Sequence, residues 1–418
     1  MRPRNPHLVL GTTLAAVAAL LVVSLLPPAH AGTEPPSSVA TAYNTQRKLA
    51  AAPDGTLYAA VAVNASGTPI ARVLERRPGG EWTTLPPPTT TGKPSDRTSL
   101  AIDSRGRLHL AWTEVTTPNR QVFYARFDGA WTTPLQLSHN PGYAGFPSIA
   151  VDGTDRVHVA WYATPDGTTY QIYYRRLDPS GWTAERALTS ANRDATNPAL
   201  ALGPDGRVHI VWARVAPRAD TEVAYLRLDG DAVAEERTLS SPLVAAFNPS
   251  LVVAPDGGIH VAWSASGRIQ YEEWDGAWRP VEDIASGTPA ALTPSLTLDP
   301  LGRPTVFWDA TDGQIYRQVR DTSWSVPNPI TFGGRNFEPS TRWSQFGNPV
   351  CNPGAGIDLI WTRESGGVLS LEYRRIGVPA ECPTRAVAPA WVLLAVGVMI
   401  AGVAIAAFRP RRKPAEPR

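Results

Sequence analysis

Four histidines recur at equivalent places in this 418-residue chain and are the first candidates for chemistry. A zinc site would need several imidazoles to converge, each with a nitrogen about 2 Å from the metal. These four histidines fall in successive copies of one sequence repeat. Packed sheets stand about 10 Å apart, so the four side chains cannot meet at one ion. We therefore predict no metal site and interpret them as polar contacts between repeats. They are His109, His158, His209 and His260.

Acidic side chains could instead hydrolyse a glycoside, which needs two carboxyl groups on one face about 5–9.5 Å apart. Glu272 and Glu273 are neighbours on an expected strand and point in opposite directions. The remaining candidates fall in expected loops on one face, where nothing in their spacing pairs them, so we interpret them as solvated charges. They are Glu114, Asp166, Asp194, Asp220, Glu222, Asp309, Asp312, Glu338 and Glu364. Nucleophile-elbow, phosphate-loop, Cys/His-pair and calcium-loop motifs are absent, so we predict no catalytic residue and no cofactor.

A third set of residues stands in most repeats just before a proline that opens an apolar stretch. Each should begin an innermost strand and ring the mouth of a central channel, where aromatic and hydrogen-bonding side chains suit a sugar or a peptide. The alternative is that they cap the strand and pack the loops. The set is Phe146, Asn197, Asn248, Thr293 and Glu338, with Arg97 at the equivalent place in the second repeat, and Tyr143, His139, Arg193, Phe247 and Phe337 nearby.

The repeat that must position these residues is about 50 residues long and occurs seven times between about Leu49 and Arg375. A tryptophan closes its second apolar stretch in six copies, at intervals of 45 to 53 residues, and Val61 replaces it in the first copy. These tryptophans are Trp112, Trp161, Trp212, Trp263, Trp308 and Trp361.

Each copy contains four extended stretches, strands A to D. In the clearest copy we expect strand A over 148–151, strand B over 156–162, strand C over 171–177 and strand D from Trp182. Four antiparallel strands repeated radially predict an all-β, seven-bladed β-propeller over residues 46–378. A sandwich would not repeat its sequence so regularly, and a solenoid has shorter repeats and needs caps. Neighbouring blades cover each other, so the strand-B tryptophans should be buried.

The last repeat lacks a fourth strand. We predict that residues 39–43, within a linker over 32–45, supply this outer strand, join the first blade to the last and remove two open edges. The A–B and C–D turns are short and stereotyped, whereas the B–C and D–A loops vary. Variable loops usually carry the binding site, so we expect a ligand on the B–C/D–A face.

Both ends of the chain predict export and membrane anchoring. A basic start, an apolar run over 8–26 and a small-x-small exit ending at Ala31 indicate a signal peptide over 1–31, although the run is also long enough for an uncleaved anchor. Residues 386–408 carry no charge and would span about 34 Å as a helix, enough for a hydrocarbon core of ~30 Å. We predict a stalk over 379–385, a transmembrane helix over 386–408 and a basic cytoplasmic tail over 409–418.

Composition agrees with a cell-surface location. In an oxidising compartment the two cysteines, Cys351 and Cys382, should form a disulfide that closes a loop of about 30 residues and stabilises the fold by roughly 3 kcal/mol. The net charge of +2 is too small to indicate a nucleic acid or another polyanion as a partner.

The Asp-Gly-x-Trp turns at 128–131 and 275–278 resemble those of the sialidase-like superfamily with its BNR (Asp-box) repeats. The family's box is Ser-x-Asp-x-Gly-x-Thr-Trp, whereas residues 101–106 lack the serine and carry one extra residue. The family's Arg-Ile-Pro signature is not matched at 68–72. The resemblance therefore implies the propeller fold and not the activity. The repeated turns are also similar to those of propeller lectins.

These observations predict a non-catalytic, membrane-anchored extracellular β-propeller that binds a glycan or a protein through its B–C/D–A loop face. One alternative is a divergent sialidase-like glycoside hydrolase, which should show an acidic pair and an arginine cluster on that face. A binding protein should show aromatic side chains there without such a pair. A third possibility is a structural platform for a membrane complex, which should show an apolar patch on the blade rims.

Overall fold

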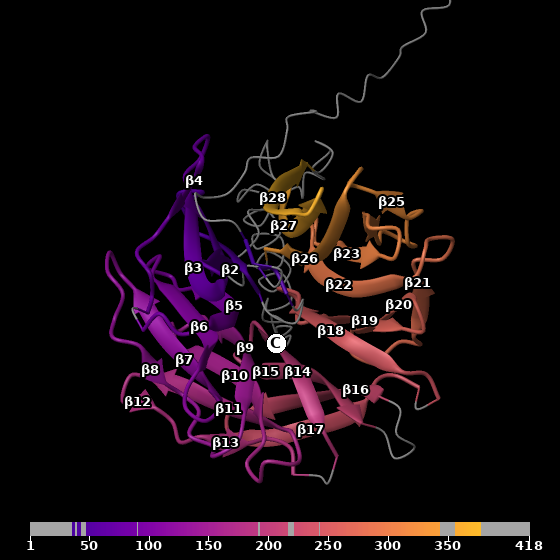
Figure 1. Cartoon of the computed structure of the whole chain (residues 1–418). Coiled ribbons are helices and arrows are strands. Elements are labelled where there is room, and N and C mark those ends of the chain that lie inside the picture. Colours follow the sequence, from indigo (N-terminus) through magenta and orange to yellow (C-terminus); the bar gives the residue numbers. More distant parts are fainter. Residues whose placement is uncertain are drawn as a thin grey trace, which may run out of the picture.

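The computed structural model describes residues 36–37, 40–42, 47–89, 91–190, 193–215, 221–241, 243–342 and 356–377. In this part of the chain every regular element is a β-strand, and the strands form seven antiparallel sheets. Figure 1 shows the sheets arranged as blades around a common centre, with strands β5, β9, β14, β18 and β22 innermost. The predicted all-β, seven-bladed propeller is confirmed, with mostly four-stranded blades.

The first four blades follow the chain in order. Blade 1 contains β1 (Leu49–Ala51), β2 (Leu57–Ala65), β3 (Thr68–Arg76) and β4 (Trp82–Thr84); blade 2 contains β5 (Ser95–Ile102), β6 (Leu108–Val115), β7 (Arg120–Phe127) and β8 (Leu135–Gln136). Blade 3 contains β9 (Ala144–Val151), β10 (Val157–Ala163), β11 (Gln171–Asp178), β12 (Gly181–Trp182) and β13 (Arg186–Ala187); blade 4 contains β14 (Ala195–Leu202), β15 (Val208–Val215), β16 (Thr221–Asp229) and β17 (Ala232–Thr238).

The remaining three blades complete the circle. Blade 5 contains β18 (Ala246–Val253), β19 (Ile259–Ala265), β20 (Arg268–Trp274) and β21 (Glu282–Ile284); blade 6 contains β22 (Ala291–Leu298), β23 (Pro304–Ala310), β24 (Ile315–Val319) and β25 (Asn328–Pro329). Blade 7 contains β26 (Arg335–Thr341), β27 (Gly356–Ser365) and β28 (Val368–Gly377), and has three strands among the described residues.

The outer strands of blades 2 and 5 begin later than predicted, whereas the outer strand of blade 3 begins at Gly181, next to the predicted Trp182. Trp131 and Trp278 form only isolated bridges with the ends of strand C, and the paired outer strands of their blades follow at Leu135 and Glu282. In blade 3 the outer strand is split into β12 and β13, which both pair with β11. An outermost strand has solvent along one edge, so few ladder hydrogen bonds define its ends.

Seven apolar clusters hold the ring together, one at each boundary between neighbouring blades. The strand-B tryptophans lie in these clusters with exposures of 0 to 3%, so their predicted burial is confirmed. The cluster that contains Leu57 and Val61 of blade 1 also contains Ile360, Leu371 and Tyr373 of blade 7. Blade 7 therefore packs directly on blade 1, beside β2 and β3 in Figure 1, and the ring is closed.

The described part of the N-terminal segment also joins these two blades, but from the inside. Pro36 pairs with Val63 of β2, and the backbone N–H of Ser37 donates to the carbonyl of Ala62 at 3.0 Å. The hydroxyls of Thr41 and Thr362 (β27) share a hydrogen bond of 2.6 Å. This position differs from the predicted outer strand over 39–43. Because β1 covers only the first three residues of β2, the inner edge of β2 is free to accept this segment.

The four repeated histidines bond within their own blades, which corrects the prediction of a contact between blades. His109 Nδ1 lies 2.8 Å from the Tyr124 hydroxyl on the next strand, and its Nε2 lies 3.1 Å from Asp103 in the A–B turn. The tyrosine then contacts the following blade, since the rings of Tyr124 and Trp182 meet edge to face at 4.9 Å. Burial lowers the pKa of the equivalent His260 to about 4, which keeps that ring neutral at pH 7.

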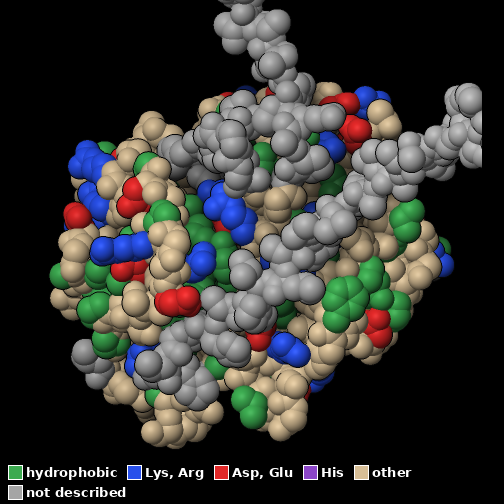
Figure 2. All heavy atoms as spheres, turned by 90° about the horizontal axis from the view of Figure 1, so that it is seen from above, with side chains coloured by type: hydrophobic (Ala, Val, Ile, Leu, Met, Phe, Trp, Pro, Cys, Tyr) green, Lys and Arg blue, Asp and Glu red, His purple; other side chains and the backbone are tan. Residues whose placement is uncertain are grey.

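Several predicted features lie outside the described residues and stay predictions. They are the signal peptide over 1–31, the stalk over 379–385, the transmembrane helix over 386–408, the basic tail over 409–418 and the disulfide between Cys351 and Cys382. Among the residues that the structure describes, none forms a helix of the length and apolarity that a membrane crossing requires. Figure 2 shows basic and acidic side chains interspersed on one side of the molecule, in keeping with the small net charge.

Candidate binding site at the channel mouth

The predicted site residues share one backbone feature, a β-bulge in the innermost strand. In blade 2 the register between β5 and β6 shifts between Asp96 and Ser99, and Arg97 has a φ of 51°. Left-handed conformations are uncommon for residues other than glycine and gather at functional sites. The same conformation recurs in five blades, two or three residues inside the strand rather than at its start. The residues are Arg97, Phe146, Asn197, Asn248 and Glu338.

The sequence explains why the bulge forms at this point. In four of the five blades the next residue is a proline, which has no N–H to give to the ladder. A bulge leaves one residue unpaired and turns its side chain away from the regular alternation. Thr293 of blade 6 also precedes a proline and stands at a register shift, but it is not among the left-handed residues. Near the channel mouth, the side chains at each bulge therefore point in directions that a regular ladder would not allow.

Charged side chains from blades 7, 1 and 2 meet at this level of the channel. Lys48, directly before β1, is fully buried, and its Nζ donates to the carbonyl of Thr98 at 2.9 Å. Burial lowers the pKa of Lys48 to about 7, opposed by the negative charges of Glu338 and Asp96. Lys48 thus contacts the residue after Arg97 in blade 2 and lies within electrostatic range of Glu338 in blade 7. Sequence reasoning missed it, although a lysine just before a buried strand was a usable signal.

Arg97 connects the charged side chains around Lys48 to the aromatic rings of blade 3. Its guanidinium carbon lies 4.6 Å from the centre of the Phe146 ring, a cation–π distance. Asp96 forms an ion pair with the same guanidinium at 2.5 Å and accepts a hydrogen bond from Arg120 at 2.8 Å. The two arginines and one aspartate leave a net positive charge beside the aromatic ring.

Aromatic rings continue from Phe146 across blade 3. Phe146 stacks on Tyr162 with ring centres 4.9 Å apart, and Tyr143 and Tyr170 lie 5.7 and 5.1 Å from Tyr162. Burial raises the pKa of Tyr143 to about 12, so its hydroxyl stays protonated at pH 7. Rings with hydroxyl groups offer both the apolar surface and the hydrogen bonds that a sugar requires.

Two carboxyl groups lie together at the boundary of blades 6 and 7. Asp309, at the end of β23, is buried and accepts hydrogen bonds from the backbone N–H of Thr293 at 2.9 Å and from the Thr293 hydroxyl. Burial raises the pKa of Asp309, against the effect of these donors and of the Glu338 backbone N–H. Burial, followed by the charge of Asp309, raises the pKa of Glu338 to about 7. The sequence showed these acids only as separate loop charges.

A cavity of about 420 Å³ opens next to this acidic pair, between the B–C turn of blade 6 and the start of β26. Asp309 lines it together with Leu292, Asp312 and Asn336. The Phe337 ring forms another wall, with the Arg335 guanidinium carbon 5.0 Å from its centre. The predicted site residue Phe337 therefore belongs to a cavity, and of the two acids only Asp309 is among its lining residues.

The remaining predicted residues lie elsewhere on the same face. Arg193 donates to Glu222 at 3.3 Å, which ties it to blade 4. Phe247 precedes the bulge of blade 5 and is 45% exposed. Asn197 and Asn248 occupy the bulges of blades 4 and 5. The ring contacts connect Arg97, Phe146 and Tyr143, and the charges of Lys48 and Glu338 act on each other, so the candidate site is best defined over blades 7, 1, 2 and 3.

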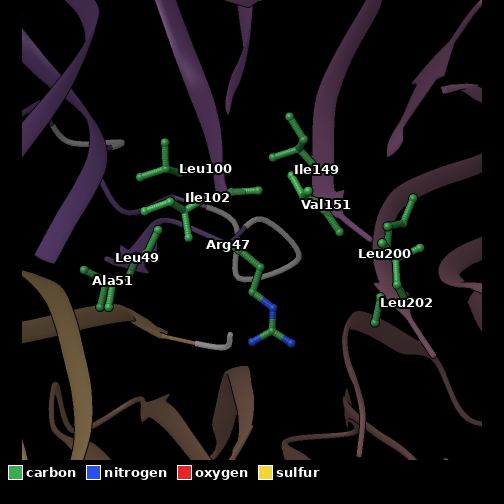
Figure 3. A pocket seen from close by; sticks show the side chains of 13 residues that line it. Arg47, Leu49, Ala51, Leu100, Ile102, Ile149, Val151, Leu200 and Leu202 are labelled. Carbon is green, nitrogen blue, oxygen red and sulfur yellow. The ribbon is translucent and has the colours of Figure 1, made fainter. Parts of the chain in front are cut away.

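The channel beneath the mouth is closed by Arg47. Its Nη1 donates to the carbonyl of Leu296 in blade 6 at 3.0 Å, and its Nη2 donates to the carbonyl of Leu251 in blade 5. Its own carbonyl accepts from the N–H of Leu100 in blade 2 at 2.7 Å. Figure 3 shows the Arg47 side chain extending into a cavity of about 50 Å³, surrounded by apolar side chains such as Ile149 and Leu200.

No known protein family matches this chain by its sequence profile, and no curated protein matches it in sequence. The structure is similar to that of an ulvan lyase of polysaccharide lyase family PL25, with a TM-score of 0.58 and 9% identity over 84% of this chain and 95% of the lyase. The structure is also similar to that of the polysaccharide lyase Uly1, with a TM-score of 0.52 and 8% identity over 79% of this chain and 90% of the lyase.

A Hadza microbial sialidase also matches, with a TM-score of 0.45 and 11% identity over 75% of this chain and 74% of the sialidase. At these identities only the fold is shared, and the chemistry must be argued from the residues of this chain.

Proposed function

We propose that this protein binds a glycan outside the cell through the mouth of its propeller, on the B–C/D–A loop face. One observation carries the proposal. The left-handed bulge residues Glu338, Arg97 and Phe146 come from three different blades; a cation–π contact joins Arg97 to Phe146, and the buried Lys48 lies within electrostatic range of Glu338 and Arg97. Strained residues that recur at the same position of several blades indicate a selected site rather than local packing.

The chemistry of the mouth suits a sugar. The tyrosines of blade 3 supply flat apolar surface and hydroxyl groups, while Arg97 and Glu338 supply a donor and an acceptor. Sugars have apolar ring faces and polar edges, and such mixed sites bind them. Arg47 crosses the centre of the ring and donates to the carbonyl of Leu296, so a glycan would contact the mouth through its end or a short stretch.

The predicted membrane anchor would present this face to the outside. The last described strand, β28, runs from the loop face and ends at Gly377 on the side of the A–B and C–D turns. A transmembrane helix over 386–408 would follow from that side. The loop face would then point away from the bilayer, toward extracellular ligands.

The alternative of a divergent glycoside hydrolase has one observation in its favour, the acidic pair of Asp309 and Glu338. Hydrolysis needs both carboxyl groups to reach the scissile bond. The Asp309 carboxyl is instead buried and hydrogen-bonded by Thr293, and the arginines nearest the mouth are held by Asp96. A ligand-binding site therefore fits the geometry better than a catalytic one.

A glycan array probed with the full chain tests the proposal, beside an assay of fluorogenic glycosides that include a sialoside. We expect binding of a defined set of glycans and no turnover. Binding should weaken at least about tenfold, or 1.4 kcal/mol, in the Phe146→Ala protein. Turnover that disappears in the Glu338→Gln protein would favour the hydrolase, and an array without any bound glycan would refute the proposal.

A further inference from the structure

The outer edge of blade 7 is open among the residues that the structure describes. This blade has the strand order β26, β27, β28, and β28 (Val368–Gly377) is its outermost strand (Figure 1). Each of the other six blades has a further strand outside strand C. An uncovered edge strand presents N–H and carbonyl groups that readily pair with another strand. The ten residues of β28 make this edge long enough for a full outer strand.

Four blades cover the loop-face end of strand C in the same way, with an apolar residue followed by a serine or threonine. In blade 3 the N–H of Ile172 donates to the Thr189 hydroxyl at 3.0 Å. The N–H of Leu188, just before that threonine, donates to the Ile172 carbonyl at 2.7 Å. The same pair of bonds joins Val122 to Leu137 and Ser138, Val223 to Leu239 and Ser240, and Ile315 to Ile330 and Thr331.

Three of these blades use a second hydroxyl at the other end of strand C. In blade 3 the N–H of Arg176 donates to the Thr183 hydroxyl at 2.9 Å, and the N–H of Thr183 donates to the Arg176 carbonyl at 2.8 Å. Equivalent bonds join Arg126 to Thr132 and Val319 to Ser325. In each of the three blades the two hydroxyl residues stand six residues apart, so the outer strand follows the pattern Ser/Thr-x-x-x-x-Leu/Ile-Ser/Thr.

Leu371 and Arg375 of β28 occupy the same two positions in blade 7. Leu371 lies opposite Thr362, the residue after Trp361, and Arg375 lies opposite Asp358, which replaces the repeated histidine. By this register the backbone N–H and carbonyl groups of Leu371 and Arg375 face the outer edge. No described residue pairs with them.

The sequence after β28 does not follow the pattern of the outer strands. By the same spacing, the hydroxyl residues would fall at 381–382 and 387–388, where the chain has Glu-Cys and Val-Ala. A second copy of this chain has no unused segment of this kind to offer either. In the whole sequence the pattern occurs only in the outer strands already paired, at 132–138, 183–189 and 325–331.

We propose that the outer edge of β28 binds an extended segment of another protein, which completes blade 7 as its fourth strand. The segment carries a serine or threonine beside Arg375 and a second one, six residues later, beside Leu371. A leucine or isoleucine stands directly before the second hydroxyl residue. In such strand addition the backbone bonds supply affinity and the side chains at fixed positions supply specificity. This surface lies on the rim of the propeller, so the proposal is independent of glycan binding at the channel mouth.

A labelled peptide with the sequence of the blade 3 outer strand, residues 181–189, tests the pattern when the full chain is titrated into it and fluorescence anisotropy is followed. The matched control is the same peptide with both threonines replaced by valine, which keeps their shape and removes the hydroxyls. We expect a dissociation constant below about 1 mM for the threonine peptide and at least about tenfold weaker binding of the valine peptide. Equal affinities, or no binding of the threonine peptide, would overturn the proposal.

Two substitutions of the exposed Arg375 test whether the peptide lies on β28. Arg375→Pro removes the outward N–H at an edge position where proline is tolerated, whereas Arg375→Ala keeps it. We expect at least about tenfold weaker binding to the proline protein and a change of less than about twofold for the alanine protein. On the wild-type chain the threonine peptide should also slow the hydrogen exchange of the β28 amides, a readout that does not depend on the folding of a variant. Full affinity of the proline protein, or unchanged exchange in β28, would place the peptide elsewhere and refute the proposal.

Discussion

Burial of charge is the feature that sets the candidate site apart at the scale of single residues. Glu338 and Lys48 both have a pKa moved to about 7, from opposite directions and chiefly by burial. Groups with such values gather at functional sites, because a fold rarely retains buried charges that only lower its stability. The cost of this arrangement should be measurable as a pH dependence of stability.

Glu338→Gln should stabilise the protein at alkaline pH. The folded pKa of Glu338 is raised from 4.5 to about 7, so between these values the unfolded chain releases a proton that the folded chain keeps. Stability therefore falls as the pH rises through this window and stays low above it. Urea unfolding should show a gain of roughly 1–3 kcal/mol for the variant at pH 8 and about none at pH 4.5. A gain that is the same at both pH values would contradict the assignment.

Trp212→Ala should cost about 3–5 kcal/mol of unfolding free energy, because the indole is fully buried at the boundary of blades 3 and 4. Val233→Ala, at an exposed position of blade 4, is the control and should change stability by less than about 0.5 kcal/mol. Chemical denaturation of both proteins gives the comparison. A loss below about 1 kcal/mol at Trp212 would mean that the tryptophan does not hold the blades together.

The bulged inner strand is the element that turns a repeated sheet into a site. Its left-handed residue is followed by proline in most blades, so backbone chemistry rather than side-chain packing sets its position. Asparagine adopts this conformation more readily than β-branched residues do. The left-handed conformation at the bulge therefore determines which substitutions the inner strand tolerates.

Asn197→Gly should leave the unfolding free energy within about 1 kcal/mol of the wild-type value, since glycine adopts a φ of 54° without strain. Asn197→Val should cost about 1–3 kcal/mol, because a β-branched residue resists the same conformation. The two proteins are compared by urea unfolding under identical conditions. Equal stabilities for the glycine and valine proteins would show that the bulge is not under strain.

Most elements could be predicted from the sequence, because apolar stretches and turn residues repeat with one spacing. Strands A to C of blade 3 were expected over 148–151, 156–162 and 171–177, and occur over Ala144–Val151, Val157–Ala163 and Gln171–Asp178. The outer strands of blades 2 and 5 were placed too early because Trp131 and Trp278 form only isolated bridges with strand C, and Trp278 packs on Tyr225 of the preceding blade. The histidine contacts were misplaced for a similar reason, since their tyrosine partners are recognised only from the register of β6 and β7.

The candidate site depends on the whole molecule, and its charges could not be paired from the sequence. Lys48 and Glu338 stand at opposite ends of the chain and meet because blade 7 packs on blade 1. Asp309 meets Glu338 across the boundary of blades 6 and 7. Closure of the ring therefore creates the site, and Arg47 adds a direct link between blades 2, 5 and 6 across the centre.

Arg47→Met should lower the unfolding free energy by about 2–4 kcal/mol, because two buried carbonyls would lose their donor. Arg207→Met is the matched control, since Arg207 is partly exposed and its ion pairs with Asp205 and Asp229 are worth less than about 1 kcal/mol. Urea unfolding monitored by tryptophan fluorescence compares the two. Unchanged or increased stability of the Arg47 variant would show that this residue does not connect the blades.

Titration of the full chain with a glycan selected on the array tests most directly whether the loop face binds. Tyr143→Ala and Phe337→Ala remove rings on that face, and Val326→Ala removes an exposed apolar group from a C–D connection on the opposite face. We expect at least one of the two loop-face variants to bind about tenfold more weakly, a loss of 1.4 kcal/mol, with the Val326 variant unchanged. Equal affinities for all four proteins, or no glycan that binds the wild-type chain, would contradict a glycan site at the channel mouth.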